Sequence, residues 1–213
     1  TLHTLYPLYR HYLRLGRLLP EQAIAGFLKR LLSGYDAVIC PSEKARGYLA
    51  SFAPHLPTVV IHNGISPERF GPDRIAAGEW VRELWGIRSG DQVILYAGRL
   101  AQEKRVLALL DAVGPLLRAG AGYRLVFAGS GPDRAALSAA IRKARLQPQV
   151  LLAGPVPWER MAGVYGLAHA FTTVSLSEMH PMTLIEAAFC GVPVVARRDA
   201  ALEGSVLERM ILN

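Results

Sequence analysis

Short apolar runs alternate with amphipathic stretches from residue 35 onward, and this alternation limits the folds open to the chain. The runs are rich in Val, Leu, Ile and Ala and indicate buried strands of a parallel sheet; they cover 37–40, 58–61, 93–97, 124–128, 150–153, 170–174 and 192–196. Helices are predicted between them, at 43–51, 104–118, 133–145, 158–166 and 182–189. Strand and helix in repetition, with short connections, predict an α/β fold with a doubly wound parallel sheet.

A cluster of turn residues at 62–67 divides the chain, and a polar stretch rich in Gly and Pro follows it up to residue 90. Two predicted strands precede the cluster and five follow it, so only the second part can form a sheet by itself. We expect a partial amino-terminal domain over 1–64 and a carboxyl-terminal domain over 65–213, truncated at its end, in which 68–196 form most of the fold. Because Thr1 is not an initiator methionine, we interpret the sequence as a partial chain.

The net charge limits the kinds of binding partner, and the cysteines and apolar runs indicate the cellular compartment. The formal net charge of +7 favours anionic partners, which include nucleic acid, a membrane face and phosphorylated small molecules. The cations are scattered and match no RNA-binding module, which argues against nucleic acid. Cys40 and Cys190 have no disulfide-framework or metal-ligand spacing, so a cytoplasmic protein is expected. No apolar run reaches the roughly 18 residues of a membrane span, and no signal peptide is recognisable.

Two cations follow the strand predicted at 93–97. Arg99 and Lys104 lie on a loop at the carboxyl end of a parallel strand, where open α/β sheets bind ligands. A guanidinium fork and an ammonium can together neutralise a diphosphate. The spacing alone is equally consistent with two solvated cations beside a helix start.

The region 175–188 carries the strongest constellation. Pro181 presets a helical turn, so the backbone N–H groups of Met182 and Thr183 form a candidate phosphate cradle. Glu178 lies in the preceding loop and Glu186 lies in the helix. Carboxylates can accept paired hydrogen bonds from vicinal hydroxyls, which suits a nucleotide sugar. As isolated residues both would more often be surface charges, but Glu186 is surrounded by apolar residues and needs a partner if it is buried.

These residues form a recognisable pattern. Ser-x-x-Glu, seven residues, then Glu-Ala-x-x-x-Gly-x-Pro-Val-Val-Ala spans 175–196 and resembles the retaining glycosyltransferases of group 1, or family four. The segments 98–104, 127–132 and 61–70 resemble the phosphate loop, the next strand and turn, and the interdomain segment of that family. The resemblance covers residues 38–196 and implies a GT-B-like architecture of two Rossmann-like domains, in which 1–64 belong to the acceptor side.

The resemblance also implies roles for single residues. Arg99 and Lys104 would bind the donor diphosphate, Glu186 the ribose, and the backbone around Val156 would lie beside the base. Glu178 would contact the donor sugar near the reacting centre. Such enzymes need no metal, and the sequence has no Asp-x-Asp motif to hold one. Charge stabilisation, rather than a protein nucleophile, would carry most of the catalysis.

The chain departs from the family in two places. The family often has Gly-Phe-Gly after the first Glu, whereas this chain has Met179-His180-Pro181, and Pro181 removes one N–H that could reach the donor sugar. The identity of the donor is therefore left open. Arg105 replaces a common Gly after the phosphate-binding Lys, a change that we expect to be harmless at a helix start.

The amino-terminal segment resembles bacterial glycosyltransferases that act on diacylglycerol lipids. Its Thr-x-His-Thr-x-Tyr pattern implies that His3 faces the acceptor as a catalytic residue, although a histidine near a terminus is usually a surface residue. Basic residues are interleaved with leucines and phenylalanine over 10–31, which fits a surface attracted to anionic lipid. An ordinary solvated helix whose leucines face the core is the alternative.

Taken together, these features predict the transfer of a hexose, with UDP-glucose or UDP-galactose as the default donor, to a hydroxyl acceptor. A diacylglycerol lipid is the favoured acceptor, and the protein would be cytoplasmic or peripheral on the inner face of the plasma membrane. Two alternatives stay open: a sugar-nucleotide epimerase of the same fold, and a non-catalytic fragment that binds the nucleotide sugar.

Overall fold

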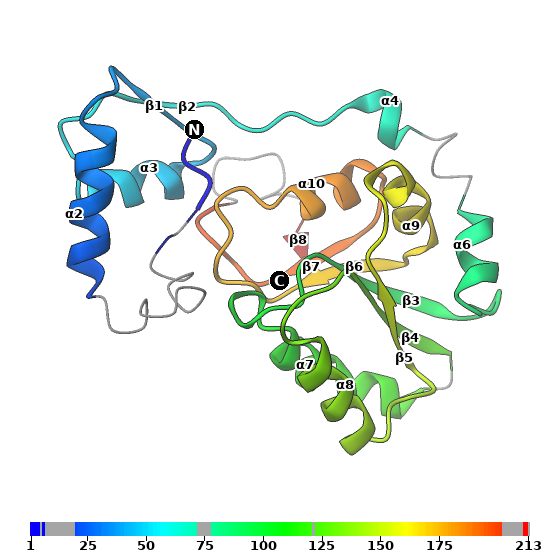
Figure 1. The fold of residues 1–213 in the computed structure, drawn as a ribbon. Helices are drawn as coiled ribbons and strands as arrows, with labels where there is room; N and C mark the ends of the chain where they lie inside the picture. Colours follow the sequence, from blue (N-terminus) through cyan, green and yellow to red (C-terminus); the bar gives the residue numbers. More distant parts are fainter. Residues whose placement is uncertain (5, 7–19, 72–77, 121, 202–210, 213) are drawn as a thin grey trace. The chain divides into compact units, whose positions relative to one another are not determined.

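The computed structural model describes the chain except residues 5, 7–19, 72–77, 121, 202–210 and 213, and it contains two compact units (Figure 1). Unit 1 comprises Thr1–Gly64, Leu176–Pro181 and Arg198–Glu208. Unit 2 comprises Ile65–Ser175, Met182–Arg197 and Arg209–Asn213. Each unit is therefore assembled from segments that are far apart in the sequence.

Unit 2 is built on a parallel sheet with the strand order β5-β4-β3-β6-β7-β8. Every pair of neighbouring strands is parallel, as the apolar runs predict. The order reverses between β3 and β6, and such a switch point creates a crevice at the carboxyl ends of the strands. The strands are β3 (Gln92–Ala97), β4 (Tyr123–Ala128), β5 (Val150–Gly154), β6 (Ala170–Thr173), β7 (Val194–Ala196) and β8 (Ile211–Leu212).

Helices cover both faces of this sheet. In Figure 1, α7 and α8 lie on one side, and α9 and α10 lie on the other. The apolar cluster between β3, β4 and the first pair of helices includes Tyr96, Leu109, Phe127 and Ile141, all buried. In the part of unit 2 that the structure describes, the helices are α4 (Pro67–Phe70), α6 (Glu79–Leu84), α7 (Val106–Ala119), α8 (Arg134–Lys143), α9 (Met161–Leu167) and α10 (Met182–Phe189).

The helix bounds agree with the sequence in part. The helix predicted over 182–189 is α10, without change. The helix predicted from residue 104 begins at Val106, after a 3₁₀ turn η3 (Gln102–Lys104), and the one predicted from residue 158 is a 3₁₀ turn η4 (Trp158–Arg160) that leads into α9. Helices α4 and α6 lie in the stretch interpreted as polar and rich in Gly and Pro, because helices of four and six residues are too short to give a clear periodic signal.

Unit 1 contains α2 (Glu21–Leu32), β1 (Val38–Cys40), α3 (Glu43–Ala50) and β2 (Thr58–Val60), and β1 pairs with β2 in parallel. The Ser42 hydroxyl caps α3 by accepting a hydrogen bond from the Ala45 N–H at 3.2 Å. The backbone N–H of Leu2 donates to the Ile39 carbonyl at 3.0 Å and fixes the first residues beside β1. The buried members of its apolar cluster are Leu2, Val38, Cys40, Ala45, Leu49, Ala53 and Met179.

Candidate functional site: a pocket at the strand switch point

A pocket of about 370 Å³ opens at the carboxyl ends of neighbouring strands in unit 2. Its wall combines the loops that follow β3, β4 and β5 with the first turns of η4, α9 and α10. The lining residues are Ala97, Gly98, Arg99, Ala128, Gly129, Ser130, Pro155, Val156, Trp158, Met161, Thr183 and Glu186. The structure thus brings together four predicted donor-binding residues from distant parts of the sequence: Arg99, Val156, Thr183 and Glu186.

Backbone hydrogen bonds connect the loops that line the pocket. The N–H of Gly98 donates to the Ala128 carbonyl at 2.9 Å, and the N–H of Gly129 donates to the Gly154 carbonyl at 2.7 Å. Gly129 has a φ of 143°, and a Cβ there would collide with the Gly98 carbonyl oxygen. Only glycine allows the two loops to approach so closely, which leaves backbone rather than side chains on this part of the wall.

A hydrogen bond to the Arg99 carbonyl fixes the backbone of this residue at the pocket. The Tyr96 hydroxyl donates to the Arg99 carbonyl at 2.8 Å, and Tyr96 is buried in the core of unit 2. A side chain of β3 therefore fixes the backbone of the loop that carries the guanidinium. Such an arrangement suits a cation that must meet a diphosphate at a defined place.

Glu186 is a buried carboxylate, 6% exposed, on α10. The Tyr165 hydroxyl donates to its Oε2 at 2.7 Å, and the indole N–H of Trp158 also donates to the carboxylate. Burial raises the pKa of Glu186, and the two hydrogen bonds act in the opposite direction. The sequence predicted that this carboxylate needs a partner; Tyr165 and Trp158 are partners within the protein. Since a carboxylate has about four acceptor positions, room remains for ribose hydroxyls.

Sequence reasoning missed the roles of Tyr165 and Trp158. Burial and the neighbouring Glu186 raise the pKa of Tyr165, so its hydroxyl stays protonated and available as a donor. The Arg69 guanidinium lies 3.5 Å from the centre of the Trp158 ring, a cation–π contact that supports the indole at the pocket wall. The aromatic residue beside Pro157 was a usable signal for Trp158, whereas nothing in the spacing relates Tyr165 to Glu186.

Two further predicted donor-binding residues, Lys104 and Met182, are near the pocket in sequence but do not line it. Lys104 ends η3, and Met182 is the first residue of α10, so its backbone N–H belongs to the first helical turn. Arg105, expected to be harmless, adopts φ 54° and ψ 40°. This left-handed conformation costs a non-glycine residue about 1 kcal/mol and would cost glycine little.

The two predicted catalytic residues, His3 and Glu178, belong to unit 1. His3 is exposed and lies near His180, whose ring stacks on that of His62 with centroids 5.4 Å apart. The Nδ1–H of His62 donates to the Pro41 carbonyl at 3.0 Å. Burial, together with His62 and His3, lowers the pKa of His180. The structure therefore gathers three histidines in unit 1, two of which the sequence did not single out.

Helix α2 carries the part of the predicted basic surface that the structure describes. Lys29 and Arg30 are exposed, as are Phe27 and Leu31 at 66% and 54%, whereas Leu28 is buried. The other basic residues of that prediction, Arg10, Arg14 and Arg17, lie outside the described residues. Near α2, a pocket of about 220 Å³ is lined by Thr1, Leu2, Tyr6, Leu28, Leu31, Leu32, Tyr35, Ala37 and Val38.

In the part of the chain that the structure describes, no helix has the length and apolar character needed to cross a membrane. The same residues contain no group of three His, Cys, Asp or Glu side chains arranged to hold a metal ion. Cys40 and Cys190 are both free thiols.

Two family models match the sequence. The model described as "Glycosyl transferases group 1" matches residues 80–206, and the model described as "Glycosyltransferase Family 4" matches residues 1–69. Alpha-monoglucosyldiacylglycerol synthase of Streptococcus pneumoniae is 30% identical, with 99% of this chain and 48% of that protein covered. A GDP-mannose-dependent phosphatidylinositol dimannoside mannosyltransferase of Mycobacterium tuberculosis is 32% identical, with 88% and 48% covered. The chain spans about half the length of these relatives.

Solved structures confirm the predicted fold class. Sucrose-phosphate synthase from Thermosynechococcus elongatus superposes with a TM-score of 0.76 at 24% identity, covering 90% of this chain and 48% of that one. Anabaena HepE, in complex with UDP and glucose, superposes with a TM-score of 0.73 at 21% identity, covering 85% and 50%. At these identities the likeness shows a shared GT-B-type, Rossmann-like fold.

Proposed function

Since the chain belongs to the glycosyl transferases of group 1, we propose that its parent protein transfers a hexose from a nucleoside-diphosphate sugar to a hydroxyl group. UDP-glucose and UDP-galactose are the proposed donors, and the configuration of the transferred sugar is retained. One observation carries the proposal: Arg99, Thr183 and Glu186 converge on one pocket at the point where the strand order reverses.

Each group in the pocket suits one part of the donor. The Arg99 guanidinium and the first turn of α10 supply positive charge for the diphosphate, both while it is bound and while it leaves. The Glu186 carboxylate, oriented by Tyr165 and Trp158, accepts hydrogen bonds from the ribose hydroxyls. The backbone around Val156 borders the space for the base. We propose that these charges, without a metal ion, stabilise the departing diphosphate.

The proposed donor site is tested by calorimetric titration of the chain with UDP, GDP and ADP. GDP belongs in the panel because one relative is named as GDP-mannose-dependent. Arg99→Ala and Glu186→Ala should each weaken UDP binding roughly 10- to 100-fold, because each removes a charged hydrogen-bond partner. Arg142→Ala, which removes an exposed guanidinium on α8, is the matched control and should bind UDP like the wild type. A folded chain that binds none of the nucleotides would refute the donor site.

We further propose a lipid acceptor at an anionic membrane surface. The name of the Streptococcus pneumoniae relative supports a diacylglycerol glycolipid, and the pocket of unit 1, which leucine, alanine and valine side chains line in part, offers a surface for acyl chains. The exposed Phe27 and Leu31 beside Lys29 and Arg30 fit a helix that lies at a lipid interface. The chain should sediment with vesicles of phosphatidylglycerol and phosphatidylcholine at low salt, and less with phosphatidylcholine alone. Equal binding to both would contradict the electrostatic part of this proposal.

A further inference from the structure

The segment Leu176–Pro181 carries Glu178 and belongs to unit 1, although β6 and α10 of unit 2 flank it in the sequence. The side chain of Met179, only 3% exposed, is a member of the apolar cluster that contains Val38, Cys40 and Leu49. The residue next to Glu178 is therefore buried among residues of the amino-terminal segment.

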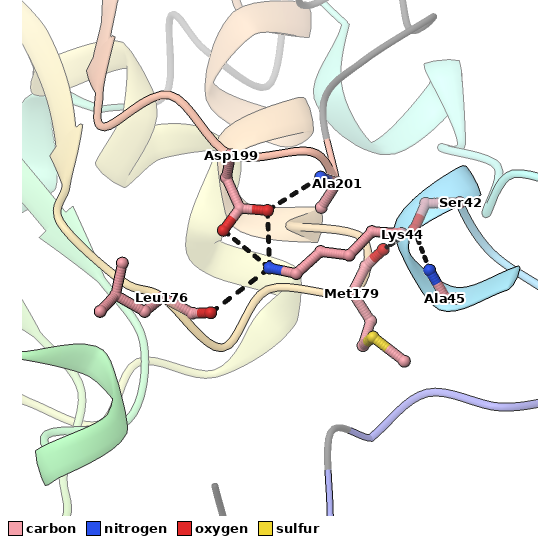
Figure 2. Close-up of polar contacts among 7 residues, drawn as sticks. All are labelled: Ser42, Lys44, Ala45, Leu176, Met179, Asp199 and Ala201. Atoms are coloured by element: carbon pink, nitrogen blue, oxygen red, sulfur yellow. Dashed lines mark hydrogen bonds and ion pairs between the residues drawn. The ribbon is translucent and has the colours of Figure 1, made fainter. Parts of the chain in front are cut away.

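Ser42 connects the start of α3 to this segment. Its hydroxyl donates to the Met179 carbonyl at 2.5 Å while it accepts from the Ala45 N–H, as Figure 2 shows. Ser42 is 1% exposed, so water does not compete for the hydroxyl. A single side chain thus caps α3 and fixes the backbone immediately after Glu178.

Lys44 holds the other end of the segment. Its Nζ donates to the Leu176 carbonyl at 3.3 Å and to both carboxylate oxygens of Asp199 at 2.7 Å (Figure 2). Asp199 in turn accepts from the Ala201 N–H at 2.8 Å, and the Lys44 and Asp199 side chains are only 19% and 10% exposed. A partly buried ion pair with a third polar partner fixes its geometry better than an exposed pair does.

We propose that Ser42 and Lys44 are positioning residues. They fix the conformation of the backbone on both sides of Glu178 and thereby determine how its carboxylate contacts the sugar of the donor. The inference rests on the proposed function and on the role that the family resemblance implies for Glu178, which is contact with that sugar. Both side chains lie at the start of α3 and donate hydrogen bonds to the carbonyls of Leu176 and Met179, which lie on either side of Glu178 in the sequence. The orientation of this carboxylate then depends on residues more than 130 positions earlier in the chain.

The inference is tested with the ratio of UDP-glucose affinity to UDP affinity, measured by calorimetry. Lys44→Met keeps the apolar stem and removes the charge, so this ratio should fall about tenfold, as it should in Glu178→Gln. The affinity for UDP alone should stay within about twofold of the wild type, because Lys44 has no part in the pocket of unit 2. Lys143→Met, which removes an exposed lysine of α8, is the matched control and should leave both values unchanged.

A double variant separates positioning from general stability. If Lys44 acts through Glu178, then Lys44→Met combined with Glu178→Gln should lower the ratio no further than Glu178→Gln alone. Additive losses would overturn the inference, and so would an unchanged ratio in Lys44→Met. A wild-type chain that fails to bind UDP would instead refute the proposed function itself, so the two failures are distinguishable.

Variants of Ser42 and Asp199 test the inference independently of Lys44→Met. Ser42→Thr retains the hydroxyl and should keep the wild-type ratio, whereas Ser42→Ala should lower it. Because Ser42→Ala also removes the cap of α3, hydrogen exchange of α3 must be followed in the same sample. Asp199→Asn leaves that cap intact, removes the partner charge of Lys44 and should lower the ratio as well. A wild-type ratio in both Ser42→Ala and Asp199→Asn would contradict the inference.

Discussion

Glu178 and Glu186 are separated by seven residues of sequence, yet unrelated parts of the chain support them. Glu186 is held within unit 2 by Tyr165, 21 positions away, and by Trp158. The backbone around Glu178 is held in unit 1 by Ser42 and Lys44, more than 130 positions away. One continuous sequence motif therefore contains two glutamates that are held in place by separate parts of the chain. This difference predicts that a substitution can disturb the surroundings of one glutamate without disturbing those of the other.

The largest expected effect is confined to unit 2. Gly129→Ala places a Cβ against the Gly98 carbonyl oxygen at a left-handed φ, so we expect a loss of about 3 kcal/mol or more in the stability of unit 2, together with the loss of UDP binding. Urea unfolding and calorimetry measure the two quantities. Gly154→Ala is the matched control, because Gly154 has a φ of 81° but nothing within 4 Å of its Cβ position. Its cost should be only about 1 to 2 kcal/mol. Equal costs for the two variants would show that the loop contact is not tight.

The next effect is confined to unit 1. Met179→Ala leaves a cavity in the cluster of β1 and α3 and should destabilise unit 1 by about 2 to 5 kcal/mol. Hydrogen exchange should rise in 38–50 and stay unchanged in β3 and β4, and UDP affinity should persist. Leu176→Ala, at a residue 38% exposed in the same segment, should leave exchange in 38–50 close to the wild type. Faster exchange in β3 as well would mean that the two units unfold together.

A smaller effect is expected for the hydroxyl of Tyr165. Tyr165→Phe removes one donor from the buried Glu186 carboxylate, which should cost unit 2 about 1 to 3 kcal/mol and weaken UDP binding. Tyr123→Phe deletes the same atom from a half-buried tyrosine of β4 and is the control. Denaturant titration and calorimetry give both readouts. If Tyr165→Phe binds UDP like Tyr123→Phe, Glu186 does not depend on this hydrogen bond for its orientation.

The smallest effects are opposite responses of the two units to acid. The pKa of His180 is lowered from 6.5, so its contribution to the stability of unit 1 is present above about pH 6.5 and is lost as the pH falls through the lowered pKa. The pKa of Glu186 is raised from 4.5, so its contribution to unit 2 is present below about pH 4.5 and is lost as the pH rises through the raised pKa. Acidification should therefore weaken unit 1 through His180 and strengthen unit 2 through Glu186.

Two variants assign these responses. His180→Phe should flatten the pH dependence of hydrogen exchange in unit 1 only, since it removes the ring that is buried beside His62 and His3. Glu186→Gln should flatten the pH dependence in unit 2 only. Each variant is the control for the other unit. A pH dependence that neither variant alters would assign the titration to other groups.

The sequence predicted β3 to β7 of unit 2 and the helix α10, because continuous apolar runs and the turn at Pro181 are local signals, but it did not predict β8 (Ile211–Leu212). It also predicted Arg99, Val156, Thr183 and Glu186, which the structure brings to one pocket. The meeting of these four residues has a general cause: parallel strands bring their carboxyl ends to one edge of the sheet, so the loops that follow the strands lie at that edge.

Other features could not be predicted from local signals. The departure Met179-His180-Pro181 was interpreted only through the N–H that Pro181 removes, whereas the structure shows Met179 as a member of the core of unit 1. The conformation of Arg105 was also missed, because a helix start does not by itself reveal a positive φ. Tyr165 and Ser42 act through partners that neither periodicity nor spacing identifies. These contacts depend on tertiary packing, which a single sequence does not display.

The burial of Met179 beside β1 has a consequence for synthesis on the ribosome. Ser42 emerges 137 residues before the carbonyl that it bonds, which at ordinary elongation rates is a delay of roughly 7 to 27 s. Strands β3, β4 and β5 are all made within that interval and can begin to pair. The apolar residues of β1 and α3 therefore lack the cover of Met179 while β3, β4 and β5 of the other sheet have already been synthesised. During this period, a chaperone that binds exposed apolar surface could bind the amino-terminal segment.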